Sequence, residues 1–387
     1  MRTIPWQVGE TAIPYLIGND CLPEIAHYLV ALDTDKILIV ADDKIKDLYG
    51  LQLQNLLHGR VEVEIVGVTS EEDGKTLATL ERLLTYALSC QLTRRSLVVS
   101  MGGGIVGNIS GTLAALLFRG IRLVHIPTTL LAMHDSVTSM KQAINHNGIK
   151  NIVGTYYLPT AILTDVAVLH TLPQEHIRSA LFELVKNALI FGGTYFSRLQ
   201  ALLPRWECID TELWIEFVKL GIEAKYDVLK DDPKEAYQGI MLEYGHTIGH
   251  ALNVAYNEAL SHGEAVAWGM VCAAEIALRL GFLVPTAYAQ HHELLHYLGD
   301  LVLPAEKPDE QFVVEKLLFD NKRGYITGLK DHVSMILLRD LGQPHGTLEE
   351  HYLTSVPLEL IRETLLQFAL VDPAPVDHTT ILPVQAH

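Results

Sequence analysis

Two histidine motifs and one distant glutamate are the residues of this chain that could do chemistry together. Residues 242–250 read Leu-Glu-Tyr-Gly-His-Thr-Ile-Gly-His, residues 262–264 read His-Gly-Glu, and residues 183–186 read Glu-Leu-Val-Lys. Two histidines and one carboxylate are typical ligands of a catalytic metal that keeps one coordination position open. Because the motifs are far apart in the sequence, only the fold can bring them together.

The spacing of His246 and His250 leaves two interpretations open. On a helix the two side chains lie one turn apart on the same face, so both could bind one metal ion. Alternatively, one binds the metal and the other faces the substrate. A helical histidine can also be purely structural, but Gly245 and Gly249 would clear room beside such a site, and His262 stands at an expected helix start.

A glycine-rich segment indicates a possible nucleotide site. Residues 102–107 read Gly-Gly-Gly-Ile-Val-Gly and stand between a strand-like run and a helical pattern. Glycines let the backbone approach a pyrophosphate, and the free N–H groups of a helix N-terminus attract it. The same residues could instead form only a tight turn between a strand and a helix.

The acidic residue that usually binds the ribose is missing from its expected place. Dinucleotide folds carry an Asp or Glu about twenty residues after the glycines, but none occurs between Gly102 and His134. An earlier strand-like run ends at Asp42. We therefore expect a different strand order, with Asp42 on the ribose.

Basic and amide side chains gather where a core would be apolar. Residues 135–145 and the pair 150–151 are polar and basic, which suits either a solvated loop or a phosphate site. The donors suited to phosphate are Arg119, Lys141, Lys150, Asn151, Lys322 and Arg323. The sequence alone does not show whether they converge.

The distribution of apolar residues predicts two domains. Short β-rich runs alternate with helical patterns in the first part, at 36–41, 60–67, 77–88, 95–101, 109–118 and 121–126. Mainly helical patterns follow, at 173–190, 211–230, 236–256, 263–280, 287–298 and 311–320, with a late strand-pair region at 330–338. We expect an α/β nucleotide-binding domain over 1–171 with parallel strands, and a mainly α-helical domain over 172–387 that ends in a loose tail from about 371.

Composition narrows the class of partner. The net charge of −17 argues against nucleic acid and anionic membranes, although a local basic cluster could still attract an anionic small molecule. The four cysteines are scattered, which favours buried thiols in a reducing compartment over a disulfide framework. No signal peptide and no bilayer-spanning run is evident, so the expected location is cytoplasmic.

The order of these motifs resembles the dehydroquinate synthase superfamily of sugar phosphate cyclases over about residues 30–340. The matching segments are 102–108, 119–120, 126–129, 135–141, 150–154, 183–186, 245–250 and 262–264. Segments 135–145, 243–246 and 320–326 are most similar to the 2-deoxy-scyllo-inosose synthases, which open the biosynthesis of aminoglycoside antibiotics. One departure is His134, where that group implies a small residue.

The resemblance implies a dehydroquinate synthase-like fold with bound NAD, one divalent metal and a homodimeric assembly. Zinc and cobalt both suit the ligand set it implies, which is Glu183, His246 and His262. It implies substrate contacts by Arg119, Asn151, Lys225 and Lys322, and catalytic roles for Lys141, Lys186, Glu243 and His250. It implies an NAD site of Asp42, Glu72, Lys75, Gly103, Gly104, Asn108, Thr128, Thr129, Asp135, Lys150 and Thr171.

Two positions bear on the substrate. Dehydroquinate synthases have an Asn where this chain has Glu243, and an Arg where it has Gly239. Losing that Arg removes a partner for a substrate carboxylate, and a Glu suits neutral hydroxyls. The resemblance thus implies conversion of D-glucose 6-phosphate to 2-deoxy-scyllo-inosose through transient NAD oxidation, phosphate elimination, reduction and intramolecular aldol closure.

Three alternatives remain at this point. A 3-dehydroquinate synthase or another seven-carbon sugar phosphate cyclase would share the motifs. A metal-dependent alcohol dehydrogenase would share the architecture but release NADH. A non-catalytic partner subunit would bind neither metal nor NAD.

Overall fold

The structure is a computed structural model that describes the chain except residues 148, 209, 320–321, 323–324, 326–328 and 373–387. It divides into two compact units, Met1–Leu242 and Glu243–His387. The change from an α/β to a helical pattern occurs inside the first unit, after β11 (Ala161–Asp165). A domain boundary after residue 171 therefore stays a prediction.

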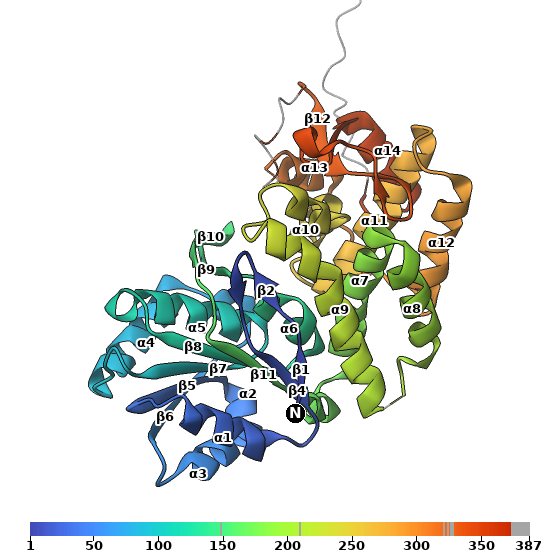
Figure 1. Ribbon diagram of the computed structural model, residues 1–387. Coiled ribbons are helices and arrows are strands. Elements are labelled where there is room, and N and C mark those ends of the chain that lie inside the picture. The colour runs from blue at the N-terminus through green and yellow to red at the C-terminus, as the bar shows by residue number, and fades with distance from the viewer. Residues whose placement is uncertain (148, 209, 320–321, 323–324, 326–328, 373–387) are drawn as a thin grey trace, which may run out of the picture. The chain divides into compact units, whose positions relative to one another are not determined.

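The first unit is built on a seven-stranded sheet in the order β1-β4-β11-β8-β7-β5-β6 (Figure 1). Its remaining strands are β1 (Arg2–Ile4), β4 (Tyr15–Gly18), β5 (Lys36–Asp42), β6 (Glu62–Val68), β7 (Leu97–Gly102) and β8 (Arg122–Pro127). Only β1 pairs antiparallel; the other neighbours in the sheet are parallel. The expected α/β unit with parallel strands is confirmed.

Helices cover both faces of this sheet because successive strand residues point to opposite sides. On β5, Leu38 and Val40 pack with α4 (Leu77–Ser89) and α5 (Gly104–Leu116). Ile37 and Ile39 pack on the other face, with α1 (Leu22–Ala31) and α3 (Leu51–Leu57). A short α2 (Asp43–Ile45) follows β5 directly.

The rest of the first unit comprises small strands and four further helices. These elements are β2 (Gln7–Val8), β3 (Thr11–Ala12), α6 (Leu130–His134), β9 (Lys141–His146), β10 (Ile149–Tyr156), α7 (Gln174–Phe191), α8 (Gly193–Leu202) and α9 (Thr211–Asp231). The polar stretch after Asp135 forms the antiparallel β9–β10 hairpin, which the sequence did not predict. Every residue of β10 is exposed, so its polarity reflects contact with solvent.

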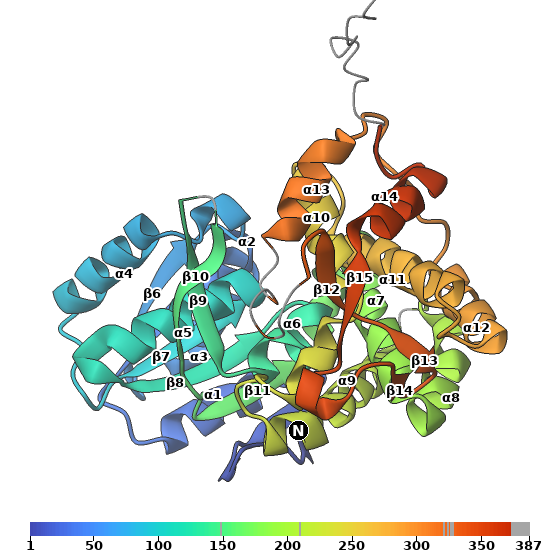
Figure 2. The ribbon, with the colours of Figure 1, turned by 90° about the horizontal axis from the view of Figure 1, so that it is seen from above.

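The second unit is mainly helical, as expected (Figure 2). Its elements are α10 (His246–Ala255), α11 (His262–Arg279), α12 (Pro285–His296), α13 (Glu310–Leu318), β12 (His332–Ile336), β13 (Leu338–Asp340), β14 (Gln343–Pro344), β15 (Leu353–Pro357) and α14 (Leu358–Gln367). The strands pair as β12 with β15 and β13 with β14. The strand region expected at 330–338 is therefore present, but β12 takes its partner from beyond it.

One local expectation was wrong. The single helix expected over 236–256 is a 3₁₀ turn, Gln238–Glu243, followed by α10. Gly245 separates them with φ +78°, a left-handed conformation that ends helical propagation. A loose tail from about 371 stays a prediction: Val371 is buried and Asp372 exchanges backbone hydrogen bonds with Pro308 and Glu310. Residues 373–387 lie outside the described part.

All four cysteines are free thiols, as expected, but only Cys21 and Cys272 are buried, whereas Cys90 is half-buried and Cys208 is exposed. Among the described residues, no helix is long and apolar enough to cross a bilayer.

Candidate active site

The glycine segment forms a tight connection from β7 into α5. Side chains at Gly103 and Gly104 would approach Thr129 to 3.3 Å and Ser136 to 2.8 Å, so only glycine leaves this passage open. The backbone N–H of Thr128 donates to the carbonyl of Gly102. The Thr128 hydroxyl is buried without a partner among the described residues. A glycine turn at a helix N-terminus, with a hydroxyl that can still donate a hydrogen bond, suits a nucleotide phosphate.

Asp42 lies at the carboxyl end of β5, beside the end of β7 in the sheet. One oxygen of its buried carboxylate accepts hydrogen bonds from the N–H groups of Lys44 (2.8 Å) and Ile45 (3.2 Å). These bonds fix the side chain at the edge of the sheet where the glycines lie. Its expected role on the ribose stays a prediction, as does that of Thr171, which contacts the Tyr49 hydroxyl at 3.2 Å.

A polar network joins two expected NAD residues to an expected phosphate ligand. Lys75 Nζ donates to the side-chain oxygen of Asn151 at 2.5 Å, and Asn145 donates to the Glu72 carboxylate at 2.7 Å. The backbone N–H of Asn151 donates to the Asn145 side chain. Burial lowers the pKa of the Lys75 ammonium, and the Glu72 carboxylate opposes part of that shift. Asn145, which the site prediction omitted, connects the network.

Arg119 lies away from these residues. It follows α5 and precedes β8, at the sheet edge where Leu97 pairs with Arg122. The glycine turn lies at the opposite edge, and α5, with 13 residues, separates the two by about 20 Å at 1.5 Å per residue. Arg119 is thus remote from the glycine turn, and its expected role at the substrate phosphate stays a prediction.

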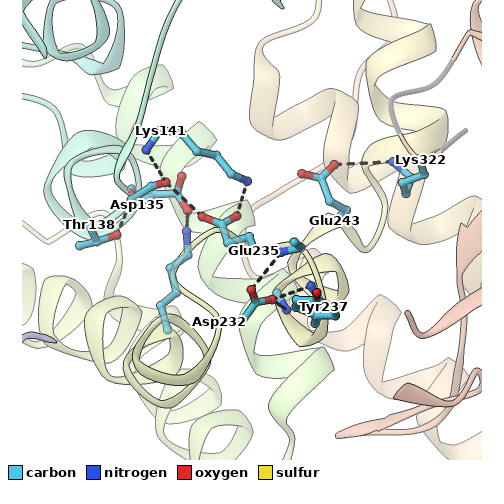
Figure 3. A network of polar contacts seen from close by, with 12 residues as sticks. Asp135, Thr138, Lys141, Asp232, Glu235, Tyr237, Glu243 and Lys322 are labelled. Carbon is cyan, nitrogen blue, oxygen red and sulfur yellow. Dashed lines mark hydrogen bonds and ion pairs between the residues drawn. The ribbon is translucent and has the colours of Figure 1, made fainter. Parts of the chain in front are cut away.

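A partly buried ion pair joins Asp135, after α6, to Lys225 on α9 (Asp135 in Figure 3). Burial alone would raise the pKa of the Asp135 carboxyl, but the nearby positive charges, that of the Lys225 ammonium foremost, together lower it. Next to this pair, His134 is fully buried, and neither of its ring nitrogens has a hydrogen-bond partner in the described structure. Gly221 on α9 makes room for it, because a side chain there would come within 2.7 Å of His134 Cβ.

Lys141 on β9 has a carboxylate partner that the sequence reading missed. Its Nζ lies 2.7 Å from Oε2 of Glu235, whose other oxygen accepts from the Ser139 hydroxyl (Figure 3). A substrate phosphate would therefore have to compete with Glu235 for the Lys141 ammonium.

Helix α7 carries Glu183 and Lys186 on one buried face. Lys186 Nζ lies 2.5 Å from a Glu183 oxygen, and both side chains are at most 3% exposed. Asn187 lies one turn after Glu183, and its buried amide has no partner among the described residues. A buried amide without a partner is a candidate ligand contact that only the structure reveals.

Glycines bring α10 and α11 into close contact. A side chain at Gly249 would approach the Ala265 carbonyl oxygen to 2.8 Å, and one at Gly269 would overlap the Gly245 carbonyl oxygen. This close packing places the imidazole of His262, at the start of α11, next to those of α10. Its ring centroid lies 5.4 Å from that of His246 and 6.0 Å from that of His250.

The hydrogen bonding of His246 prepares it to bind a metal. Its Nδ1 lies 3.1 Å from the Tyr244 carbonyl oxygen, which can only accept, so Nδ1 carries the hydrogen. A metal ion would then bind this ring through Nε2. Burial lowers the pKa of His250 to about 3, with a further contribution from His246, so its ring stays neutral at physiological pH. Neutral imidazole is the form that binds metals.

Glu243 and Lys322 form an ion pair in the second unit (Figure 3). The carboxylate oxygen lies 3.6 Å from Nζ, and Lys322 is almost fully buried while a quarter of the Glu243 side chain is exposed. These two expected site residues are therefore together. Most of the segment 320–326, including Arg323, lies outside the described residues.

Gly239 belongs to a turn that has no room for a side chain. The carboxylate of Asp232 accepts backbone hydrogen bonds from Ala236, Tyr237 and Gly239 (Figure 3). A side chain at Gly239 would lie 2.7 Å from Cβ of Glu235 and 3.1 Å from an Asp232 oxygen. An arginine at this position would require the turn to open.

Comparisons with known proteins agree with the motifs. Residues 65–179 match the family model described as 3-dehydroquinate synthase N-terminal, and residues 180–323 match the model described as 3-dehydroquinate synthase C-terminal. A 2-deoxy-scyllo-inosose synthase of Micromonospora echinospora is 42% identical over 363 residues, which cover 94% of this chain and 91% of that protein. One of Streptoalloteichus tenebrarius is 42% identical over 95% of this chain and 96% of its own length.

A crystal structure extends the likeness to the fold. It is the structure of a 2-deoxy-scyllo-inosose synthase complexed with carbaglucose-6-phosphate, NAD⁺ and Co²⁺. It is 33% identical, with a TM-score of 0.89, over 95% of this chain and 100% of that one. The expected fold class is thereby confirmed. The chain therefore belongs to the 3-dehydroquinate synthase family, and its near-full-length relatives within that family are 2-deoxy-scyllo-inosose synthases.

Proposed function

We propose that this protein is a sugar phosphate cyclase that converts D-glucose 6-phosphate to 2-deoxy-scyllo-inosose and phosphate, in the biosynthesis of aminoglycoside antibiotics. Two relatives of that name are 42% identical to this chain over nearly their whole length. A related structure holds a glucose 6-phosphate analogue, NAD⁺ and Co²⁺. These ligands fit the expectations of NAD, a divalent metal and a hexose phosphate.

The closed turn at Gly239 is the observation that favours this substrate over a carboxylated seven-carbon sugar. An Arg in the dehydroquinate synthases occupies this position, and here even a Cβ would lie 2.7 Å from Glu235. A substrate carboxylate would lack that partner and would also meet the negative charge of Glu243. A neutral polyol would instead find a hydrogen-bond acceptor in Glu243.

We assign the metal to Glu183, His246 and His262, whose donor types could hold one ion. The contact of His246 Nδ1 with the Tyr244 carbonyl supports this assignment, because it orients Nε2 as the ligand atom. The glycine turn and the Thr128 hydroxyl support NAD binding in the first unit. Bound NAD would accept a hydride and return it within each turnover, and the metal would polarise the substrate oxygens as a Lewis acid.

The chain's own residues would orient the sugar and move its protons. We assign Glu243 to proton transfer near the carbons C4 and C5 of the sugar, with His250 as a second candidate. Lys141, Asn151 and Lys322 would hold the phosphate, whose departure their donors favour. Lys186 and Lys225 would contact the sugar hydroxyls.

The decisive experiment is phosphate release from glucose 6-phosphate in the presence of NAD and Co²⁺, with the carbocyclic product identified by mass spectrometry. Phosphate plus a deoxyinosose, with no net NADH, supports the proposal. Release only from the seven-carbon precursor of dehydroquinate would identify a dehydroquinate synthase. Net NADH without phosphate release would indicate an alcohol dehydrogenase.

We further propose a homodimer in the cytoplasm. The family likeness and the free cysteines support these two assignments. Sedimentation equilibrium of the purified protein and fractionation of the source cells test them separately.

A further inference from the structure

A buried tyrosine lies in the sequence between Glu243 and His246, two residues of the proposed site. Tyr244 lies between Glu243 and the Gly245-His246 pair, and its side chain is fully buried. Its hydroxyl lies 2.9 Å from Nε2 of His291, a buried histidine on α12 that no part of the proposed chemistry uses. The two rings also meet edge to face, with centroids 5.9 Å apart.

The direction of each hydrogen bond in this pair follows from its partners. Nδ1 of His291 lies 2.6 Å from the Ala287 carbonyl oxygen, so Nδ1 must donate. Burial lowers the pKa of His291 to about 4, so the neutral ring accepts at Nε2. The Tyr244 hydroxyl is then the donor to His291. Tyr244 therefore donates to His291, and His291 donates to Ala287. These two hydrogen bonds fix the tyrosine ring to α12.

The same tyrosine sets the orientation of His246. Its backbone carbonyl accepts from His246 Nδ1, so a metal ion would bind that ring through Nε2. The next residue, Gly245, has φ +78° and packs so closely on α11 that a side chain would lie 2.9 Å from the Val266 carbonyl oxygen. Tyr244 is thus held at its hydroxyl by α12, and the turn after it is held by α11.

We propose that Tyr244 and His291 are positioning residues for the metal ligand His246, acting through the Tyr244 backbone carbonyl. This inference rests on the proposed function only in that His246 binds the metal. Side chains that orient a ligating histidine through its second nitrogen commonly change metal affinity by about 10–100-fold when they are removed. Here the orienting group is a backbone carbonyl, which mutation cannot delete. The role is therefore tested by changing the Tyr244 side chain that holds this carbonyl in place.

The test is the Co²⁺ affinity of the full-length protein, measured by competition with a chromophoric chelator, together with the visible absorption spectrum of the bound Co²⁺. Tyr244→Phe and His291→Leu should each weaken binding by about 10-fold or more and change the spectrum. The double variant should bind Co²⁺ no more weakly than the weaker-binding single variant, because both changes break the same hydrogen bond. His291→Gln, which keeps an acceptor for the hydroxyl, should recover most of the affinity.

Tyr256→Phe is the matched control. Its hydroxyl donates to the Leu370 carbonyl at 2.7 Å from the end of α10, so the variant loses a buried hydrogen bond of the same kind. It should lose stability but keep the affinity for Co²⁺. If Tyr244→Phe and His291→Leu behave like this control, the proposal is wrong.

Folding and function can be separated in this design. If His291→Leu does not fold, Tyr244→Phe carries the test, and a Co²⁺ affinity equal to that of Tyr256→Phe would overturn the positioning role. If the wild-type protein binds no Co²⁺ at all, the metal assignment fails and this inference fails with it. Wild-type binding with unchanged variants would overturn the positioning role alone.

Discussion

Glu243 combines a titratable carboxylate with a buried cation beside it. Its oxygen lies 3.6 Å from Lys322 Nζ, which exceeds an ordinary hydrogen-bond distance, so the contact is an ion pair rather than a direct hydrogen bond. A carboxylate can take up and release a proton, whereas an amide of the same shape cannot. The pair therefore offers a test of which property of Glu243 matters.

Glu243→Gln should reduce kcat by about 10²–10⁴-fold, the usual contribution of a general acid–base group. The fold should persist, because the amide occupies nearly the same volume and can still face Lys322. Steady-state phosphate release and circular dichroism provide the two measurements. Glu363→Gln, in an exposed pair with Arg279, is the control and should leave kcat unchanged. Near-normal turnover in Glu243→Gln would remove Glu243 from the chemistry.

The packing of α10 on α11 positions three imidazoles. These helices meet at glycines, and the Gly245 carbonyl occupies the space that a Gly269 side chain would need. The histidine cluster thus depends on two backbones approaching more closely than any side chain would permit.

Gly269→Ala should destabilise the protein by about 3 kcal/mol or more, because the new methyl group meets backbone rather than a movable side chain. Urea denaturation measures the loss. Gly107→Ala, inside α5, is the control, because its added methyl group would come no closer than 3.8 Å to His125. That change should be neutral or stabilise the protein by up to about 1 kcal/mol. Equal stability of the two variants would show that α10 and α11 can separate at little cost.

Sequence patterns predicted those elements whose signal is local. Expected strands at 36–41 and 95–101 correspond to β5 and β7, and the helix expected at 211–230 corresponds to α9, because apolar periodicity is a property of each segment alone. The break at Gly245 was missed because its left-handed conformation follows from contacts with α11, far along the chain.

The sequence predicted which residues belong to the site, but not which side chains contact them. The motifs identified His246 and His262, which the structure brings together in the second unit. They gave no sign of Glu235 beside Lys141 or of His291 behind Tyr244. Such partners lie on other elements and have no fixed spacing, so only tertiary structure reveals them. The fold also separates Arg119 from the glycine turn, which the sequence could not indicate.

At the scale of the molecule, a metal bound by residues from distant motifs should stabilise the fold. A ligand that binds only the native state adds about 2.7 kcal/mol at 100 times its Kd. Co²⁺ should therefore raise the Tm of the metal-free protein, and a chelator should reverse the rise. His262→Ala should abolish this response, whereas His296→Ala, on an exposed site of α12, should preserve it. A full Co²⁺ response in His262→Ala would contradict the ligand assignment.

Buried neutral histidines should make the whole molecule sensitive to acid. Burial lowers the pKa of His125, His134 and His291 to about 4 in the folded state. In the unfolded chain each titrates near pH 6.5, so between about pH 6.5 and 4 the unfolded state binds more protons. Stability is therefore fully present above about pH 6.5 and falls as the pH is lowered, by up to about 1.4 kcal/mol per pH unit for each histidine.

His125 allows this effect to be measured at one residue, because both of its ring nitrogens lack partners in the described structure. His125→Leu removes one proton-binding group from the unfolded state without leaving a hydrogen-bond partner unsatisfied. Urea denaturation of the metal-free protein from pH 7 to 4.5 should give a stability slope that is shallower by about 1.4 kcal/mol per pH unit. His58→Leu, at an exposed position, should retain the wild-type slope. If His125→Leu also retained it, His125 would have to bind its proton in the folded protein, and the polar space around it would be open to water.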